Sequence, residues 1–172
     1  MSLEKLRSAY EGFLEAVVIV LMVALSAEVT LGIVYRTIGA SLVWYDEVAA
    51  ILLAWLTFYG SALAALKRAH IGFPGFVNSL SPAWRLPAVL FAEACVFAFF
   101  ILLGWMGWAI LGVLDTDHLV SLPEVPVAWT QSVIPIGAAL FVLAEALNLP
   151  GTLAAAAGRG TVATSDLAEK LH

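Results

Sequence analysis

Long uncharged stretches separated by short polar segments dominate the chain. The clearest one runs without a formal charge from Val48 to Leu66, between the acidic pair Asp46–Glu47 and the basic pair Lys67–Arg68. At about 1.5 Å per residue, such a stretch covers roughly 30 Å as a helix, which is the hydrocarbon thickness of a bilayer. A soluble helix rarely stays apolar on every side over this length. The pattern therefore predicts a membrane-spanning helix with opposite charges at its two ends.

Three further apolar stretches predict three further spans, which makes the chain an all-α integral membrane protein. The predicted spans cover about residues 13–35, 44–66, 82–114 and 126–149. Ser81 followed by Pro82 has the features of a helix start, a capping hydroxyl with proline at the first helical position. We assign residues 1–150 to one four-span membrane domain.

The fourth span contains a predicted kink point and a predicted end. Pro135 lacks the backbone N–H of a helix interior and favours a kink. Asn148, Pro150 and Gly151 are typical of a helix end. The remaining residues, 151–172, are rich in Ala, Gly and Thr, and we expect a mobile tail.

The segment between the second and third spans has a weak amphipathic pattern. Phe73, Phe76, Val77 and Leu80 recur at the spacing of one helical face. A short interfacial helix over residues 71–80, lying on the lipid surface, is one interpretation. An ordinary irregular loop fits the pattern equally well.

The basic residues predict the orientation of the spans. Of the 8 Lys and Arg residues, all except Arg36 fall in the two terminal segments or near the loop between the second and third spans. Because cytoplasmic segments carry an excess of Lys and Arg, both termini and that loop are predicted to be cytoplasmic.

Composition excludes several classes of protein. The chain is 62% hydrophobic and only 12% charged, with a mean hydropathy of +0.97, whereas globular domains carry about 25% charged residues. The net charge is −5 and no basic tract indicates nucleic-acid binding. The single cysteine, Cys95, excludes an internal disulfide and a multi-cysteine metal site. No nucleophile–base pair, phosphate loop or HExxH motif occurs, so the sequence predicts no catalytic, cofactor-binding or metal-binding residue and no enzyme.

Four acidic residues fall inside the predicted spans, where ionisable side chains are functional candidates. Glu15 and Glu145 lie close enough to an interface for their carboxylates to reach the headgroups. Glu28 and Glu93 lie deeper, in opposite leaflets, so they are not expected to form one site. We interpret them as polar contacts between helices or with a partner, and a proton or sodium relay is the alternative.

Charged and aromatic residues at the ends of the second span are candidate contacts. Asp46 and Glu47 can face Arg36 across a short loop and form an ion pair that clamps the first hairpin; an unpaired acidic surface is the alternative. Trp44 has the character of an interfacial anchor. His70 follows two basic residues and favours a headgroup or helix-end contact over metal binding.

A face of small residues on the second span offers a further candidate contact. Gly60 and Ala64 are four residues apart, a spacing that lets helices approach closely in lipid. Gly104, Gly107 and Gly112 punctuate the third span in a similar way. The pattern favours helix packing over any chemistry.

An ordered set of short motifs resembles the small membrane subunit of tripartite ATP-independent periplasmic (TRAP) transporters over about residues 10–150. The motifs are YR at Tyr35–Arg36, Trp44, Glu47, WLTFYGSA at Trp55–Ala62, RAHI at Arg68–Ile71, VPVAW at Val125–Trp129 and IPIG at Ile134–Gly137. Two positions depart from the family pattern: Asp46 opens what is often a Glu-Glu pair, and Gly72-Phe73-Pro74 follows the histidine motif.

The resemblance implies a role in secondary transport across the bacterial inner membrane. In this family a periplasmic binding protein delivers an organic anion, often a carboxylate, to a large membrane subunit that performs sodium-coupled import. The small subunit is expected to act as a scaffold beside the large one, without substrate, sodium or cofactor of its own. The candidate structural or partner-contact residues are Arg36, Trp44, Asp46, Glu47, Gly60, His70 and Glu93. The competing hypothesis is a small integral-membrane enzyme, or a homo-oligomeric channel or exchanger, that uses Glu28 or Glu93.

Overall fold

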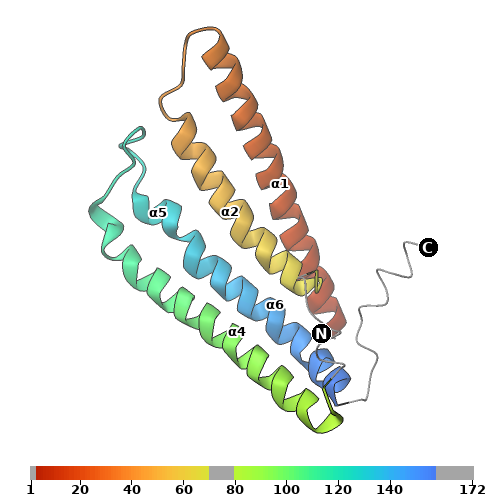
Figure 1. The fold of residues 1–172 in the computed structure, drawn as a ribbon. Helices are drawn as coiled ribbons and strands as arrows, with labels where there is room; N and C mark the ends of the chain where they lie inside the picture. The colour runs from red at the N-terminus through yellow and green to blue at the C-terminus, as the bar shows by residue number, and fades with distance from the viewer. Residues whose placement is uncertain (1–2, 70–79, 158–172) are drawn as a thin grey trace, which may run out of the picture.

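The computed structural model describes residues 3–69 and 80–157 and confirms an all-α chain with four helices long and apolar enough to cross a membrane (Figure 1). The long helices are α1 (Leu3–Thr37), α2 (Tyr45–Leu66), α4 (Pro82–Leu111) and α6 (Val133–Ala156), and two short ones are the 3-10 turn η1 (Leu114–Thr116) and α5 (Val127–Gln131). His70, residues 71–79 of the predicted interfacial segment 71–80, and residues 158–172 of the predicted tail 151–172 lie outside the described residues.

The four long helices form a single layer in the order α1–α2–α6–α4. α1 packs on α2, α2 on α6, and α6 on α4, so the last helix of the chain lies inside the layer (Figure 1). α1 begins and α6 ends at the same end of the layer, called here the terminal end; the other is the distal end. No described residue outside these helices covers either face of the layer at α4, where Phe91, Trp105 and Trp108 are each more than 70% exposed. Such a layer is compatible with lipid because apolar side chains need no dry interior there.

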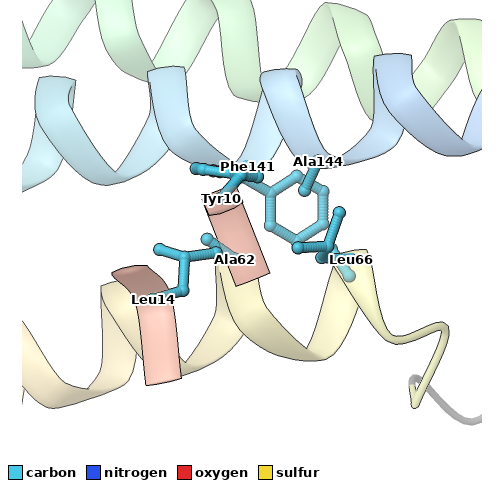
Figure 2. Close-up of a cluster of buried hydrophobic side chains, with 7 residues drawn as sticks. Tyr10, Leu14, Ala62, Leu66, Phe141 and Ala144 are labelled. Carbon is cyan, nitrogen blue, oxygen red and sulfur yellow. The ribbon is translucent and has the colours of Figure 1, made fainter. Parts of the chain in front are cut away.

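The buried core lies near the terminal end, where α1, α2 and α6 meet (Figure 2). Its members are Tyr10, Leu14, Ala62, Ala65, Leu66, Phe141 and Ala144. The alanines let the helix backbones approach closely. Phe100 of α4 stacks on Phe141, with ring centroids 3.6 Å apart, so all four helices are tied to this cluster.

Close helix approach elsewhere depends on two glycines. A Cβ on Gly137 of α6 would lie 2.6 Å from the Phe58 ring, and one on Gly107 of α4 would lie 2.7 Å from Ile134. A Cβ on Gly60 would meet nothing within 4 Å. Within residues 3–69 and 80–157, Gly60 therefore brings no two helices together, whereas Gly107 of the third span does so.

The fourth span is broken just before Pro135. α5 ends at Gln131 and α6 starts at Val133. The proline ring clashes with the carbonyl four residues earlier, and the missing N–H cannot bond to it; here that carbonyl belongs to Gln131. Pro135 thus separates two helices instead of kinking one.

The predicted end of the fourth span is wrong, because α6 continues through Pro150 and Gly151 to Ala156. The Arg68 guanidinium bonds to the Asn148 carbonyl and to the Thr152 hydroxyl, both at 2.5 Å. These contacts bracket the proline and hold the backbone on either side of it, so the helix survives the one hydrogen bond that Pro150 removes.

The start of α1 and the capping of α4 differ from prediction. α1 starts at Leu3, ten residues early, because its first turns pack on α2 and α6 through Tyr10 and Leu14. Its 35 residues span roughly 50 Å, which exceeds a bilayer core. α4 starts at Pro82 as predicted, but the Ser81 hydroxyl makes no capping bond; the Ser81 carbonyl accepts from the Trp84 N–H at 2.9 Å.

Candidate functional site

The C-terminus of α2 ends in a tight, left-handed turn at Arg68. Arg68 has φ 53°, a conformation that favours glycine. Its N–H donates to the Ala65 carbonyl at 3.0 Å, and the Ala69 N–H donates to Ala64 at 2.9 Å. This pair of bonds is a Schellman motif, which satisfies carbonyls that the helix end would otherwise leave open. The turn also aims the Arg68 side chain at α6.

Side chains from α1 and α6 bond to the last carbonyls of α2. The Asn148 amide, 3% exposed, donates to Ala65 at 2.8 Å and to Leu66 at 3.1 Å. Arg7 of α1 also donates to the Leu66 carbonyl, at 3.2 Å. We call Arg7, Arg68, Asn148 and Thr152 the α2 clamp. Through the α2 clamp, side chains of α1 and α6 cap the C-terminus of α2, so three helices are joined at this point.

Tyr10 links α1 directly to α6 across the small residues of α2. Its hydroxyl donates to the Leu140 carbonyl at 2.6 Å, and its ring lies in the core beside Ala62 and Phe141 (Figure 2). A buried hydroxyl in an apolar layer needs such a partner. The contact fixes the register of two helices that α2 otherwise separates.

Lys67 forms ion pairs with two glutamates of α1 at the terminal end. Its amine pairs with Glu15 and, at 3.4 Å, with Glu11. Hydrogen bonding to Glu15 raises the pKa of Lys67 above 10.5, so the amine stays charged at neutral pH. The sequence predicted that the Glu15 carboxylate reaches the headgroups. In the structure, it pairs with Lys67 at the end of the neighbouring helix.

Substitutions at Arg68 separate the backbone role from the side-chain role. We expect Arg68→Ala to lose the two bonds to α6 and keep an unfavourable φ, whereas Arg68→Gly loses the bonds alone. Because a left-handed residue with a Cβ costs about 1–2 kcal/mol, the Gly variant should unfold at higher SDS concentration than the Ala variant. Equal stability of the two would show that the turn does not persist in the membrane.

At the distal end, Glu47 holds the loop between η1 and α5. Its carboxylate accepts from the Val120 N–H at 3.2 Å, from the Ser121 N–H at 2.8 Å and from the Ser121 hydroxyl. Charge-assisted bonds of this kind are about twice as strong as neutral ones. The first turn of α2 is thereby tied to a loop that lies more than seventy residues later in the chain.

The predicted ion pair between Arg36 and the acidic pair does not form. Glu47 faces the loop of residues 117–126, and the described contacts of Arg36, Asp46 and Glu47 include no salt bridge among the three. The physical reason is competition: converging backbone N–H groups satisfy the Glu47 carboxylate. Arg36 and Asp46 line a common cavity without joining.

Hydrogen exchange tests the Glu47 contact. We expect Glu47→Gln to speed amide exchange at Val120 and Ser121 about tenfold, because the neutral amide offers one acceptor and turns its NH₂ toward a donor. Asp46→Asn is the matched control, since Asp46 makes no contact with this loop among the described hydrogen bonds. Equal protection in the two variants would contradict the structural role of Glu47.

A comparison with models of protein families identifies the family of this chain. Residues 25–154 match the family described as the DctQ component of tripartite ATP-independent periplasmic transporters. The chain belongs to this family. The match covers all of α2 and α4, α6 except its last two residues, and about the last third of α1. No curated protein matches the chain.

Within this TRAP small subunit, the two deep glutamates lie toward opposite ends of the layer. Glu93 of α4 is half-buried and within electrostatic range of Arg68, at the terminal end. Glu28 of α1 is 8% exposed and has a buried oxygen without a hydrogen-bond partner among the described residues. It lies one turn from Gly32, which abuts Tyr45 at the start of α2.

Trp44 is the half-buried residue before α2 and makes no capping bond with its side chain. No group of three or more His, Cys, Asp or Glu residues within the described ranges is placed to hold a metal. Sequence reasoning missed Asn148 as a contact and interpreted it only as a helix end; a lone amide in an apolar run was the available signal.

Proposed function

We propose that this chain is the scaffold subunit of a sodium-coupled TRAP transporter that imports an organic anion, of the carboxylate class, across the bacterial inner membrane. It acts with a large membrane subunit and a periplasmic binding protein. In this role it binds neither substrate nor sodium. Its four-helix layer braces the large subunit in the bilayer.

The single-layer packing is the observation that supports this proposal. A pathway for ions needs polar groups that converge between helices, and most of the described interhelical polar contacts here gather at the two ends of α2. Between those ends, the Trp55 indole N–H donates to the Thr130 carbonyl at 3.0 Å, so this bond satisfies a backbone group. The uncovered apolar faces, with Trp105 and Trp108 on α4, leave area for a large partner. These features favour a scaffold subunit over a channel or exchanger.

Reconstitution tests the proposal. Full-length chain alone in proteoliposomes should pass no radioactive sodium above protein-free vesicles, and it should co-purify with the large membrane subunit of its transporter when the two are co-expressed. Sodium flux through the chain alone would overturn the scaffold role and favour a channel or exchanger.

Variants of the two deep glutamates provide a second test of the scaffold proposal. Glu28→Gln and Glu93→Gln should lower the yield of the complex and leave the sodium dependence of transport unchanged. Glu124→Gln, an exposed acid of the distal loop, is the control for both. Loss of sodium coupling with an intact complex would contradict the proposal and assign a relay to the glutamate concerned.

A further inference from the structure

The end of α1 and the start of α2 lie side by side at the distal end (Figure 1), and residues of both line a cavity there. It has a volume of about 300 Å³ and is lined by Gly32, Arg36, Ser41, Leu42, Tyr45 and Asp46. Ligand pockets run from about 300 to 1,000 Å³, so this one has room for a small polar group.

One glycine lines the cavity, and a second one forms the turn beside it. A Cβ on Gly32 would lie 2.1 Å from the Tyr45 ring, so only glycine lets that ring pack against α1. Gly39 has φ 77°, and the Ala40 N–H donates to the Tyr35 carbonyl at 2.9 Å. This left-handed turn ends α1 and returns the chain toward α2. The backbone therefore holds the cavity open independently of its charged residues.

Opposite charges line the cavity without neutralising each other. Arg36 and Asp46 both contribute to its surface, yet neither appears in the described salt bridges. A guanidinium binds a phosphate through two parallel N–H groups, and a carboxylate accepts hydrogen bonds from a primary ammonium. The lining is thus complementary to a ligand that carries both a phosphate and an ammonium group.

The position of the cavity matches the headgroup layer. Arg36 lies in the last turn of α1 and Asp46 in the first turn of α2, so both stand where spans leave the hydrocarbon. Ile33, Ile38 and Val43 nearby are exposed apolar residues, Val43 at 83%, and acyl chains can cover them. We propose that the cavity binds the phosphoethanolamine headgroup of a membrane lipid, with the phosphate on Arg36 and the ammonium on Asp46.

Competing lipid headgroups fit less well for chemical reasons. A glycerol headgroup supplies the phosphate and leaves the Asp46 carboxylate without a cation. A choline headgroup supplies a cation that has no N–H to donate. The ammonium of ethanolamine is the feature that Asp46 selects.

Native mass spectrometry of the full-length chain in detergent tests the selection. Titrated with phosphatidylethanolamine, phosphatidylglycerol and phosphatidylcholine of the same acyl chains, the chain should bind the first about tenfold tighter than the others, the change expected from one charge-assisted hydrogen bond. Equal binding of the three lipids would overturn the proposal.

Charge-neutralising variants assign the two contacts. Asp46→Asn should reduce ethanolamine-lipid binding to the level of the glycerol lipid, and Arg36→Gln should weaken both about tenfold. Asp115→Asn and Lys5→Gln, at exposed positions outside the cavity, should change nothing. All four positions are exposed, and circular dichroism checks that each variant keeps its helices. Unchanged selectivity in Asp46→Asn would refute the role of that carboxylate.

A soluble competitor separates a lipid from a free headgroup. Glycerophosphoethanolamine carries the same two charges without acyl chains, and we expect it to compete at least tenfold more weakly than the lipid. Competition as strong as that of the lipid would overturn the assignment to a membrane lipid.

Discussion

Replacing Gly137 by Ala is expected to force α2 and α6 apart at the middle of the layer. The added Cβ would lie 2.6 Å from Cδ1 and 2.7 Å from Cβ of Phe58. Rotation of the ring can move Cδ1, but the Phe58 Cβ is fixed to its backbone, so the helices themselves must shift. Overpacking of this kind costs about 1–3 kcal/mol. Reversible unfolding in mixed SDS micelles should show a loss of that size.

Gly60→Ala is the matched control, because it makes the same substitution in a neighbouring helix where nothing lies within 4 Å. Alanine favours a helix interior over glycine by about 1 kcal/mol, so this variant should be neutral or more stable. Subtracting the change in unfolding free energy of Gly60→Ala from that of Gly137→Ala removes the contribution of helix propensity and leaves the steric contribution. Equal stability would mean that α2 and α6 do not approach at Gly137.

The Gly137 contact also connects stability to the proposed role. α2 and α6 are the two inner helices of the layer, and each outer helix packs on one of them. A shift between them changes the position of α1 relative to α4 and hence the surface offered to a partner. We therefore expect Gly137→Ala to lower the yield of the complex with the large subunit more than Gly60→Ala does.

The four spans could be predicted from the sequence because the bilayer sets the required length of an apolar helix. The order of the helices in the layer could not. Helices that are apolar on nearly every side carry little information about which side faces a neighbour. The position of α6 between α2 and α4 depends on Gly137, Gly107 and the alanines of the core, and small residues also occur where nothing packs, as at Gly60.

The charged residues at the ends of α2 could be identified, but their partners could not. Proximity in sequence favoured an ion pair between Arg36 and Asp46 or Glu47. In the structure, the Glu47 carboxylate instead accepts hydrogen bonds from the N–H groups of Val120 and Ser121. Backbone donors have no signature in the sequence. For the same reason, the bonds of Asn148 to the end of α2 could not be anticipated from a lone amide.

Asn148→Leu should be the most damaging substitution in the α2 clamp. Leucine has a similar volume and better helix propensity, so packing and backbone are preserved while both donated bonds disappear. Arg7 still donates to the Leu66 carbonyl, and the Ala65 carbonyl loses the bond from the Asn148 amide and keeps the one from the Arg68 N–H. Polar contacts between membrane helices contribute about 0.6–2 kcal/mol each, so we expect a loss of roughly 1–3 kcal/mol in SDS unfolding.

Gln131→Leu is the control for Asn148→Leu, since it removes an exposed amide at the end of α5 and should change stability by less than about 0.5 kcal/mol. The clamp adds a second readout: amide exchange at Arg68 and Ala69 should rise in Asn148→Leu, because the turn loses its anchor on α6. If Asn148→Leu matched Gln131→Leu in both measurements, the Asn148 amide would contribute nothing to holding the end of α2. If Asn148→Leu lowers stability and leaves amide exchange at Val120 and Ser121 unchanged, the two ends of α2 are held independently of each other.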